Sequence, residues 1–83
     1  MKYISITEVL NLNKIIKEAN LPYLIHLRDA CGKQSLWIEF LEESASAEQN
    51  RGSLDQILKE YFDGLRFTIE FSEDKINFWI TAN

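Results

Sequence analysis

Apolar residues return every three or four positions near the start of the chain, which is typical of a helix with one buried face. This pattern predicts a helix over 6–19. Ser5 and Glu8 have the spacing of a capping box, in which each side chain bonds the other residue's backbone N–H. Asn20 can adopt the left-handed conformation that ends a helix, and Pro22 prevents its continuation. The residues expected to face the core are Val9, Leu12 and Ile16.

A second helical pattern lies in the second half of the chain. Ser53 and Gln56 have the spacing of another capping box, so we expect the helix to begin at Ser53. Gly64 is expected as the glycine that ends this helix. The residues expected on its buried face are Leu54, Ile57, Leu58 and Tyr61, with Phe62 beside them.

Four segments alternate apolar and polar residues, as strands with one buried face do. They cover 23–28, 34–41, 66–71 and 76–81. Short turns separate the strands of each pair, which favours two antiparallel hairpins. The segment 42–52 has no apolar period, and we expect a loop or a frayed helical turn there. The strand residues expected in the core are Ile25, Leu27, Leu36, Ile38, Phe40, Phe67, Ile69, Phe78 and Ile80.

The elements therefore follow in the order αββαββ, and the second half repeats the helix–hairpin order of the first. Because each helix has one apolar face, we expect an α+β fold of two layers, with both helices on one face of an antiparallel sheet. A curled, β-rich, barrel-like sandwich is the alternative, and a short leading strand over 2–4 is left open. We expect residues 1–83 to form one domain, since 83 residues suffice for a single core.

Composition narrows the classes of function. Nine Lys and Arg against 13 Asp and Glu give a formal net charge of −4, which argues against a protein that coats nucleic acid. No apolar run is long enough to span a bilayer, and the first residues lack the apolar stretch of a signal peptide. A single Cys cannot form an internal disulfide, so we expect a cytoplasmic protein. No phosphate loop or zinc-ligand set occurs, and we expect no metal or other cofactor.

The densest group of reactive side chains lies around the first hairpin turn: His26, Arg28, Asp29, Cys31, Gly32 and Lys33. A thiolate near neutral pH needs positive charge nearby, and Arg28 and Lys33 could supply it to Cys31. Gly32 would let a ligand approach the sulfur closely. The alternative is that Cys31 is a small residue in a tight turn with solvated neighbours. A Cys–His nucleophile pair with His26 is also open, although its geometry is unknown from sequence.

Two resemblances involve this turn. The stretch 27–32, Leu-Arg-Asp-Ala-Cys-Gly, follows a capped helix and the Leu-Pro-Tyr of 21–23, and it resembles a small uncharacterised bacterial family known by an Arg-Asp-Ala-Cys motif. That resemblance covers nearly the whole chain and implies no established activity. A fainter one is to the HesB-like A-type iron–sulfur carriers, through Leu27-Arg28, Cys31-Gly32 and the aromatic strand after them. Those carriers have two further cysteines, whereas this chain has none, and a cluster needs about four ligands.

Two tryptophans alternate out of phase with the expected core. If the apolar sets face the helices, Trp37 and Trp79 must point to the other side of the sheet, together with Leu24, His26, Arg28, Leu41, Arg66 and Thr68. Trp and Arg are enriched where interfaces concentrate their energy. We therefore expect a non-enzymatic binding module that self-associates or binds another protein, with Trp37, Trp79, Leu24 and Arg66 at the interface. The rival is a thiol-dependent redox, sulfur-handling or metal-carrying protein that uses Cys31.

Overall fold

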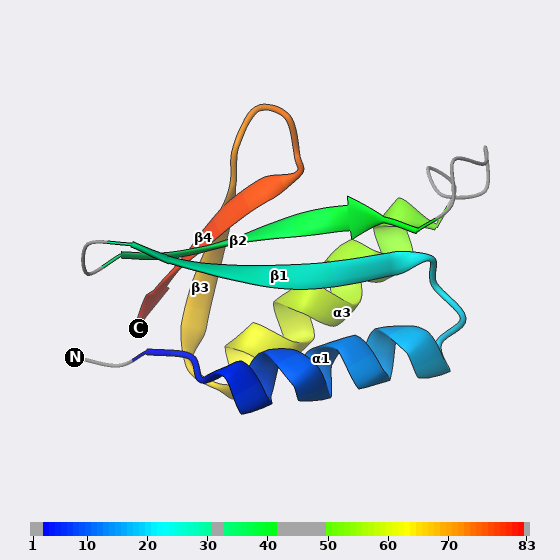
Figure 1. The fold of residues 1–83 in the computed structure, drawn as a ribbon, viewed down its shortest axis with the longest axis horizontal. Coiled ribbons are helices and arrows are strands. Elements are labelled where there is room, and N and C mark those ends of the chain that lie inside the picture. Colours follow the sequence, from blue (N-terminus) through cyan, green and yellow to red (C-terminus); the bar gives the residue numbers. More distant parts are fainter. Residues whose placement is uncertain (1–2, 31–32, 42–49, 83) are drawn as a thin grey trace.

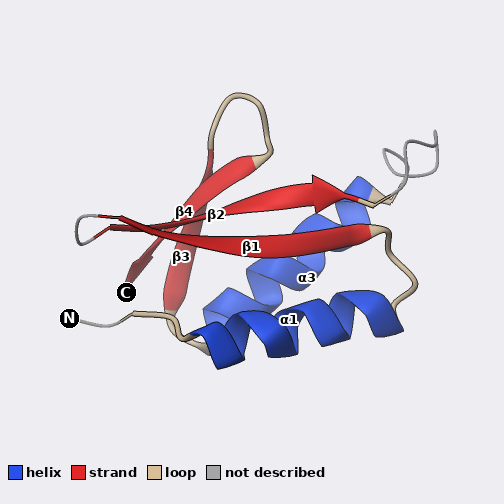
Figure 2. Ribbon diagram, viewed as in Figure 1, coloured by secondary structure: helices blue, strands red, loops and turns tan. Residues whose placement is uncertain are grey.

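The computed structural model of the chain describes residues 3–30, 33–41 and 50–82. They form two helices and four strands: α1 (Ile6–Glu18), β1 (Tyr23–Ala30), β2 (Lys33–Phe40), α3 (Arg51–Gly64), β3 (Phe67–Phe71) and β4 (Asn77–Ala82). Both helices lie on the same side of one open sheet (Figure 1). The predicted two-layer α+β fold is confirmed, and the barrel-like alternative is wrong because the sheet does not close (Figure 2).

The sheet is antiparallel throughout, with the strand order β1-β2-β4-β3. Each hairpin therefore contributes one inner and one edge strand, and the two hairpins meet where β2 pairs with β4. In each half the helix packs against the edge strand of its own hairpin. The two halves are thus arranged as a pseudo-two-fold pair around the middle of the sheet.

The start of α1 is the predicted capping box. The hydroxyl of Ser5 accepts a hydrogen bond from the Glu8 N–H at 3.2 Å, and Glu8 Oε1 accepts one from the Ser5 N–H at 2.9 Å. At the other end, Asn20 adopts the predicted left-handed conformation with φ of 60°. These local signals determine both ends of the helix.

The predicted capping box of α3 is wrong. This helix begins two residues earlier, at Arg51, and Ser53 lies exposed inside its first turn. Arg51 fixes the earlier start: its Nε donates to Asp55 Oδ1 at 2.7 Å, another guanidinium N–H donates to the Lys75 carbonyl, and the group lies over the Phe71 ring. The N-cap residue, Asn50, makes no side-chain hydrogen bond to the helix. The contacts of Arg51 with the β3–β4 turn therefore determine where the helix begins.

The end of α3 also differs from the prediction. Gly64 is the last helical residue, and Leu65 is the C-cap. The residue with positive φ is Arg66, at 66°. Arg66 thus lies in the turn before β3 and not in the strand, which begins at Phe67.

The core lies between the helices and the sheet, and 13 apolar residues among those described are buried there. One core prediction is wrong: Phe40 is 43% exposed at the end of β2. Phe62 of α3 is fully buried, and the predicted core residues Leu27, Ile57, Tyr61, Ile69 and Ile80 are partly buried and pack against the core. Tyr61 is only partly buried because its hydroxyl needs a partner, which is the Glu8 carbonyl at 2.7 Å.

Tyr3 and Ile4 do not form the short leading strand that was left open. A side chain instead bonds this backbone: Gln34 Oε1 accepts from the Ile4 N–H at 2.7 Å, and Gln34 Nε2 donates to the Ile4 carbonyl at 2.9 Å. The carboxamide thus makes the two hydrogen bonds that a neighbouring strand would make.

Candidate functional site

The face of the sheet opposite the helices, called the open face below, carries polar and aromatic side chains. Its members follow from the strand registers, because directly paired residues share a face. One row across the sheet holds Arg28, Ser35, Trp79 and Glu70 in that order, and the next row holds His26, Trp37 and Asn77. Leu24, Glu39, Thr68 and Thr81 also lie on this face.

His26 and Trp37 form a stacked pair on the open face. Their ring centroids lie 4.2 Å apart with an interplanar angle of 17°. His26 Nε2 lies 2.6 Å from Glu39 Oε1, and it must donate there because a carboxylate only accepts. The Trp37 indole thus stacks on one face of the imidazole, and Glu39 bonds its edge. Together these two contacts fix the orientation of the ring.

Trp79 lies beside this pair and is 40% exposed. Its indole N–H donates to Glu70 Oε2 at 3.1 Å, across the β3–β4 pair. Ser35, its direct neighbour on β2, is the smallest side chain in the row. A large, exposed aromatic side chain therefore lies next to a much smaller side chain on the same face.

The structure separates the other members of the predicted interface. Leu24 and Arg28 lie on the open face in β1, and the Arg28 side chain is exposed. Leu41 follows the end of β2, and Arg66 precedes β3, so neither belongs to the paired rows. Of the predicted interface residues, Trp37, Trp79 and Leu24 share the open face, while Arg66 lies in a turn.

The turn with the reactive side chains is shorter than predicted. Asp29 was expected in the turn, but β1 continues to Ala30, and Asp29 pairs with Gln34 while Ala30 pairs with Lys33. The antiparallel register continues without a bulge up to this pair. Cys31 and Gly32 lie outside the described residues, so the thiol-dependent alternative stays a prediction.

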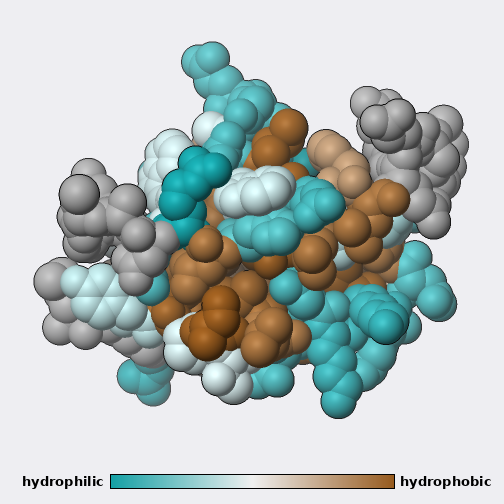
Figure 3. Space-filling view, in the orientation of Figure 1, coloured by the Kyte–Doolittle hydropathy of each residue, from teal (hydrophilic) through white to brown (hydrophobic). Residues whose placement is uncertain are grey.

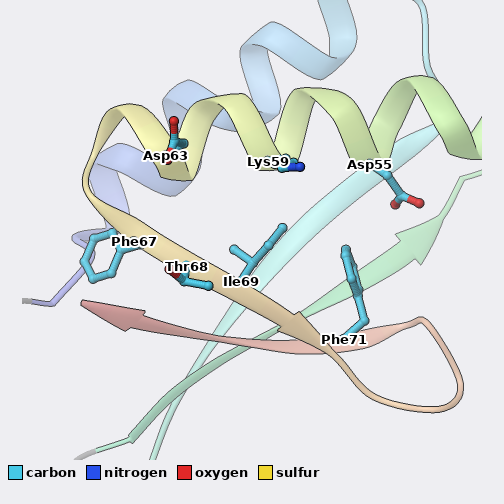
Figure 4. A pocket seen from close by; sticks show the side chains of 7 residues that line it. All are labelled: Asp55, Lys59, Asp63, Phe67, Thr68, Ile69 and Phe71. Atoms are coloured by element: carbon cyan, nitrogen blue, oxygen red, sulfur yellow. The ribbon is translucent and has the colours of Figure 1, made fainter. Parts of the chain in front are cut away.

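A groove between α3 and β3 is a second candidate site, and the sequence did not indicate it. It has a volume of about 370 Å³ and is lined by Asp55, Lys59 and Asp63 of α3 and by Phe67, Thr68, Ile69 and Phe71 of β3. Figure 4 shows the charged side chains along the helix and the apolar ones along the strand. The helix residues recur every four positions, which in sequence is typical of a solvated face. These charged side chains line a groove because β3, the strand beside them, lies at the edge of the sheet.

Apolar side chains also reach solvent on α1, away from the α3–β3 groove. Figure 3 shows them gathered over the first half of α1 and the neighbouring part of β1, while the second half of α1 is hydrophilic. Ile6 and Leu10, both 61% exposed, are the most exposed large apolar residues of α1. They lie one turn apart on the helix surface.

Two titratable groups in the described part of the chain have shifted pKa values, and both stabilise connections between elements. The pKa of the Asp74 carboxyl lies well below its usual range, chiefly because it accepts a hydrogen bond from the Ser72 hydroxyl and further bonds from the backbone N–H groups of Ile76 and Asn77. Burial, with a smaller contribution from the Glu8 carboxylate, raises the pKa of Tyr61. Asp74 thus orders the β3–β4 turn, and Tyr61 joins α3 to α1.

Comparison with known proteins gives no relative: no family model, curated protein or solved structure matches the chain. Among the described residues, neither helix combines the length and apolar content that crossing a bilayer requires. The candidate sites are therefore the open face and the α3–β3 groove, each known only from its own geometry.

Proposed function

We propose that the protein is a non-enzymatic interaction module that self-associates through the open face of its sheet. The observation that carries this proposal is the group of Trp37, Trp79 and His26 on a face that neither helix covers. Tryptophan contributes more to interfaces than its frequency suggests, because it buries a large rigid surface and keeps one polar N–H. A cytoplasmic location accompanies the proposal, supported by the single Cys.

Shape favours a second copy as the partner. Two sheets that pack face to face keep their strands within about 30° of each other. A two-fold axis between the sheets and parallel to the strands, passing between β2 and β4, would bring β1 of one copy over β3 of the other. Trp79 of one copy would then lie over Ser35 of the second, so that the largest side chain of the row meets the smallest.

Charge favours the same arrangement. The row that holds Trp79 begins with Arg28 on β1 and ends with Glu70 on β3. The same two-fold would bring Arg28 of each copy opposite Glu70 of the other, which gives two ion pairs at the rim of the interface. Such pairs select the partner and its register more than they add affinity.

Sedimentation velocity over a range of concentrations tests the proposal. The unmodified chain should form a dimer, and Trp79→Ala should shift it toward monomer because the central contact is lost. Leu10→Ala is the matched control, since it removes an even more exposed apolar side chain, from α1 instead of the open face. A protein that stays monomeric at the highest concentration would exclude self-association.

Charge reversal tests the arrangement itself. Arg28→Glu and Glu70→Arg should each weaken the dimer, because each places like charges opposite one another. The double variant should recover most of the loss, since both pairs are then restored with reversed sign. Absence of this recovery would show that the copies meet in another way.

A further inference from the structure

The edge strand β3 has unused hydrogen-bonding capacity beside the groove. The Ser72 N–H donates to the Asn77 carbonyl at 2.9 Å, directly beside the last pair of the β3–β4 ladder. Antiparallel pairing alternates along the ladder, so Ile69 and Phe71 turn their N–H and C=O groups away from β4. Among the described residues, no side chain bonds these groups of Ile69. The groove is thus bordered by a strand edge that is ready to pair.

The opposite edge of the same sheet is occupied at Ile25. Ile25 of β1 likewise turns its N–H and C=O away from β2, because the N–H of its partner Ile38 points the other way and donates to the carbonyl of Ile76, just before β4. Asn13 of α1 takes both groups: its Oδ1 accepts from the Ile25 N–H at 2.7 Å, and its Nδ2 donates to the Ile25 carbonyl at 2.9 Å. One carboxamide therefore fills the place of one peptide unit of a further strand.

The second half of the chain has a lysine where the first has this asparagine. Asn13 follows the fully buried Leu12, and Lys59 follows the fully buried Leu58 at the corresponding place in α3. A lysine ammonium only donates hydrogen bonds, so Lys59 cannot bond both an N–H and a carbonyl. The position that Asn13 closes on β1 is consequently open on β3, as the groove of about 370 Å³.

The helix wall of the groove presents acidic, basic and acidic side chains in turn, and the first of them, Asp55, also accepts a hydrogen bond from Arg51 through Oδ1. Asp55, Lys59 and Asp63 lie four residues apart, so they rise by about 6 Å each along α3. Side chains on one face of an extended strand recur at about 6.8 Å. A strand laid along β3 could therefore set one charged side chain opposite each of the three.

A second copy of the chain does not suit this wall. Two-fold pairing of β3 with β3 about Ile69 would set Lys59 against Lys59 of the other copy, and Asp55 against Asp63. Every pair would then have like charges, which is unfavourable at an interface. The wall instead fits a foreign segment with the opposite order of charges.

We propose that the α3–β3 groove binds an extended peptide segment of a partner protein as a fifth strand, with basic side chains facing Asp55 and Asp63 and an acidic one facing Lys59. The backbone of the peptide pairs with Ile69 and Phe71, as in other complexes that add a strand to a sheet edge. The apolar side chains of Ile69 and Phe71 form the floor beneath it (Figure 4). This site shares no residue with the rows of the open face that hold Trp37 and Trp79.

The test uses the full chain and a fluorescein-labelled synthetic peptide, Thr-Val-Lys-Val-Glu-Val-Lys-Val-Thr, with fluorescence anisotropy as the readout. Its charge order is the same read in either direction, so the result does not depend on the orientation of the strand. The peptide should bind, and its charge-reversed version, with Glu and Lys exchanged, should bind at least tenfold more weakly. No binding of either peptide at millimolar concentration, or equal binding of both, would overturn the proposal.

Backbone pairing is tested by N-methylation. One peptide is methylated at its three charged residues and another at the valines between them, because only alternate N–H groups of an added strand face its neighbour. Binding should be lost with the first peptide if the strands are antiparallel and with the second if they are parallel. An equal effect of the two methylations would contradict strand addition.

Protein variants locate the site. Asp63→Lys should narrow the preference between the two peptides, because one of the three facing pairs changes from attractive to repulsive while the other two still favour the unreversed peptide; circular dichroism shows that the fold is kept. The Trp79→Ala chain should bind the peptide as well as the unmodified chain does, so a failure of self-association and a failure of peptide binding are distinguishable. Peptide that dissociates a dimer of the chain would show that a second copy occupies this edge, and would also overturn the proposal.

Discussion

Replacement of Asn13 by alanine tests whether a side chain can complete a sheet edge. The change removes two hydrogen bonds, 2.7 and 2.9 Å long, between the carboxamide and the Ile25 backbone. At a net contribution of about 1 kcal/mol each, their loss costs about 2 kcal/mol. Alanine favours the helix by about 0.6 kcal/mol over asparagine. The free energy of unfolding should therefore fall by about 1.4 kcal/mol, which lowers Tm by roughly 6–11 °C in a domain of this size.

Asn11 supplies the matched control, because it is an exposed asparagine on the same helix. Asn11→Ala should gain the helical preference of alanine and lose no bond to the sheet, so Tm should rise slightly. Urea unfolding measures both variants, and hydrogen exchange at the Ile25 amide reports the lost bond directly. If the two variants differ by less than about 0.5 kcal/mol, the carboxamide does not stabilise the edge.

Three further predictions follow from the fold. Phe62→Ala should cost about 3–5 kcal/mol in chemical denaturation, whereas Phe40→Ala, at a position 43% exposed, should cost less than half as much; similar losses would mean that the burial pattern is misassigned. Tyr61→Phe should lower stability by about 0.5–1.5 kcal/mol through loss of the hydrogen bond to the Glu8 carbonyl, and an unchanged midpoint in urea would contradict that role. Because the pKa of Asp74 is depressed in the folded state, its carboxylate stabilises the fold above the usual aspartate pKa, and this contribution is lost as the pH falls below about 4. The difference in Tm between the unmodified chain and Asp74→Asn should therefore narrow in acid. A difference that stays constant with pH would refute this.

The elements governed by local chemistry could be predicted from the sequence. The capping box at Ser5 and the alternation of the strands determine α1 and the faces of the sheet, because each depends on residues within a few positions. The start of α3 could not be predicted in this way. Ser53 has the right local pattern, but Arg51 bonds the turn before β4, more than twenty residues away, and begins the helix earlier.

Of the two candidate sites, the open face could be predicted from local sequence and the groove could not. Alternation alone assigns Trp37 and Trp79 to one face, since side-chain direction in a strand has a period of two. The groove depends on β3 being an edge strand, which follows from the pairing of β2 with β4 across the two halves. Before that pairing is known, Lys59 and Asp63 are ordinary charged residues on the wet side of a helix.

The unequal edges of the sheet limit how large an assembly of this chain can become. A sheet with two open edges accepts strands at both ends and can polymerise without limit, as fibrils do. Among the described residues, Asn13 occupies the β1 edge at Ile25, whereas the β3 edge borders a groove that could take a new strand. Growth by edge pairing therefore stops after a single addition, because a strand accepted at β3 has no corresponding place at β1. The β3 edge can therefore stay exposed for binding a partner without allowing copies of the chain to assemble into a fibril.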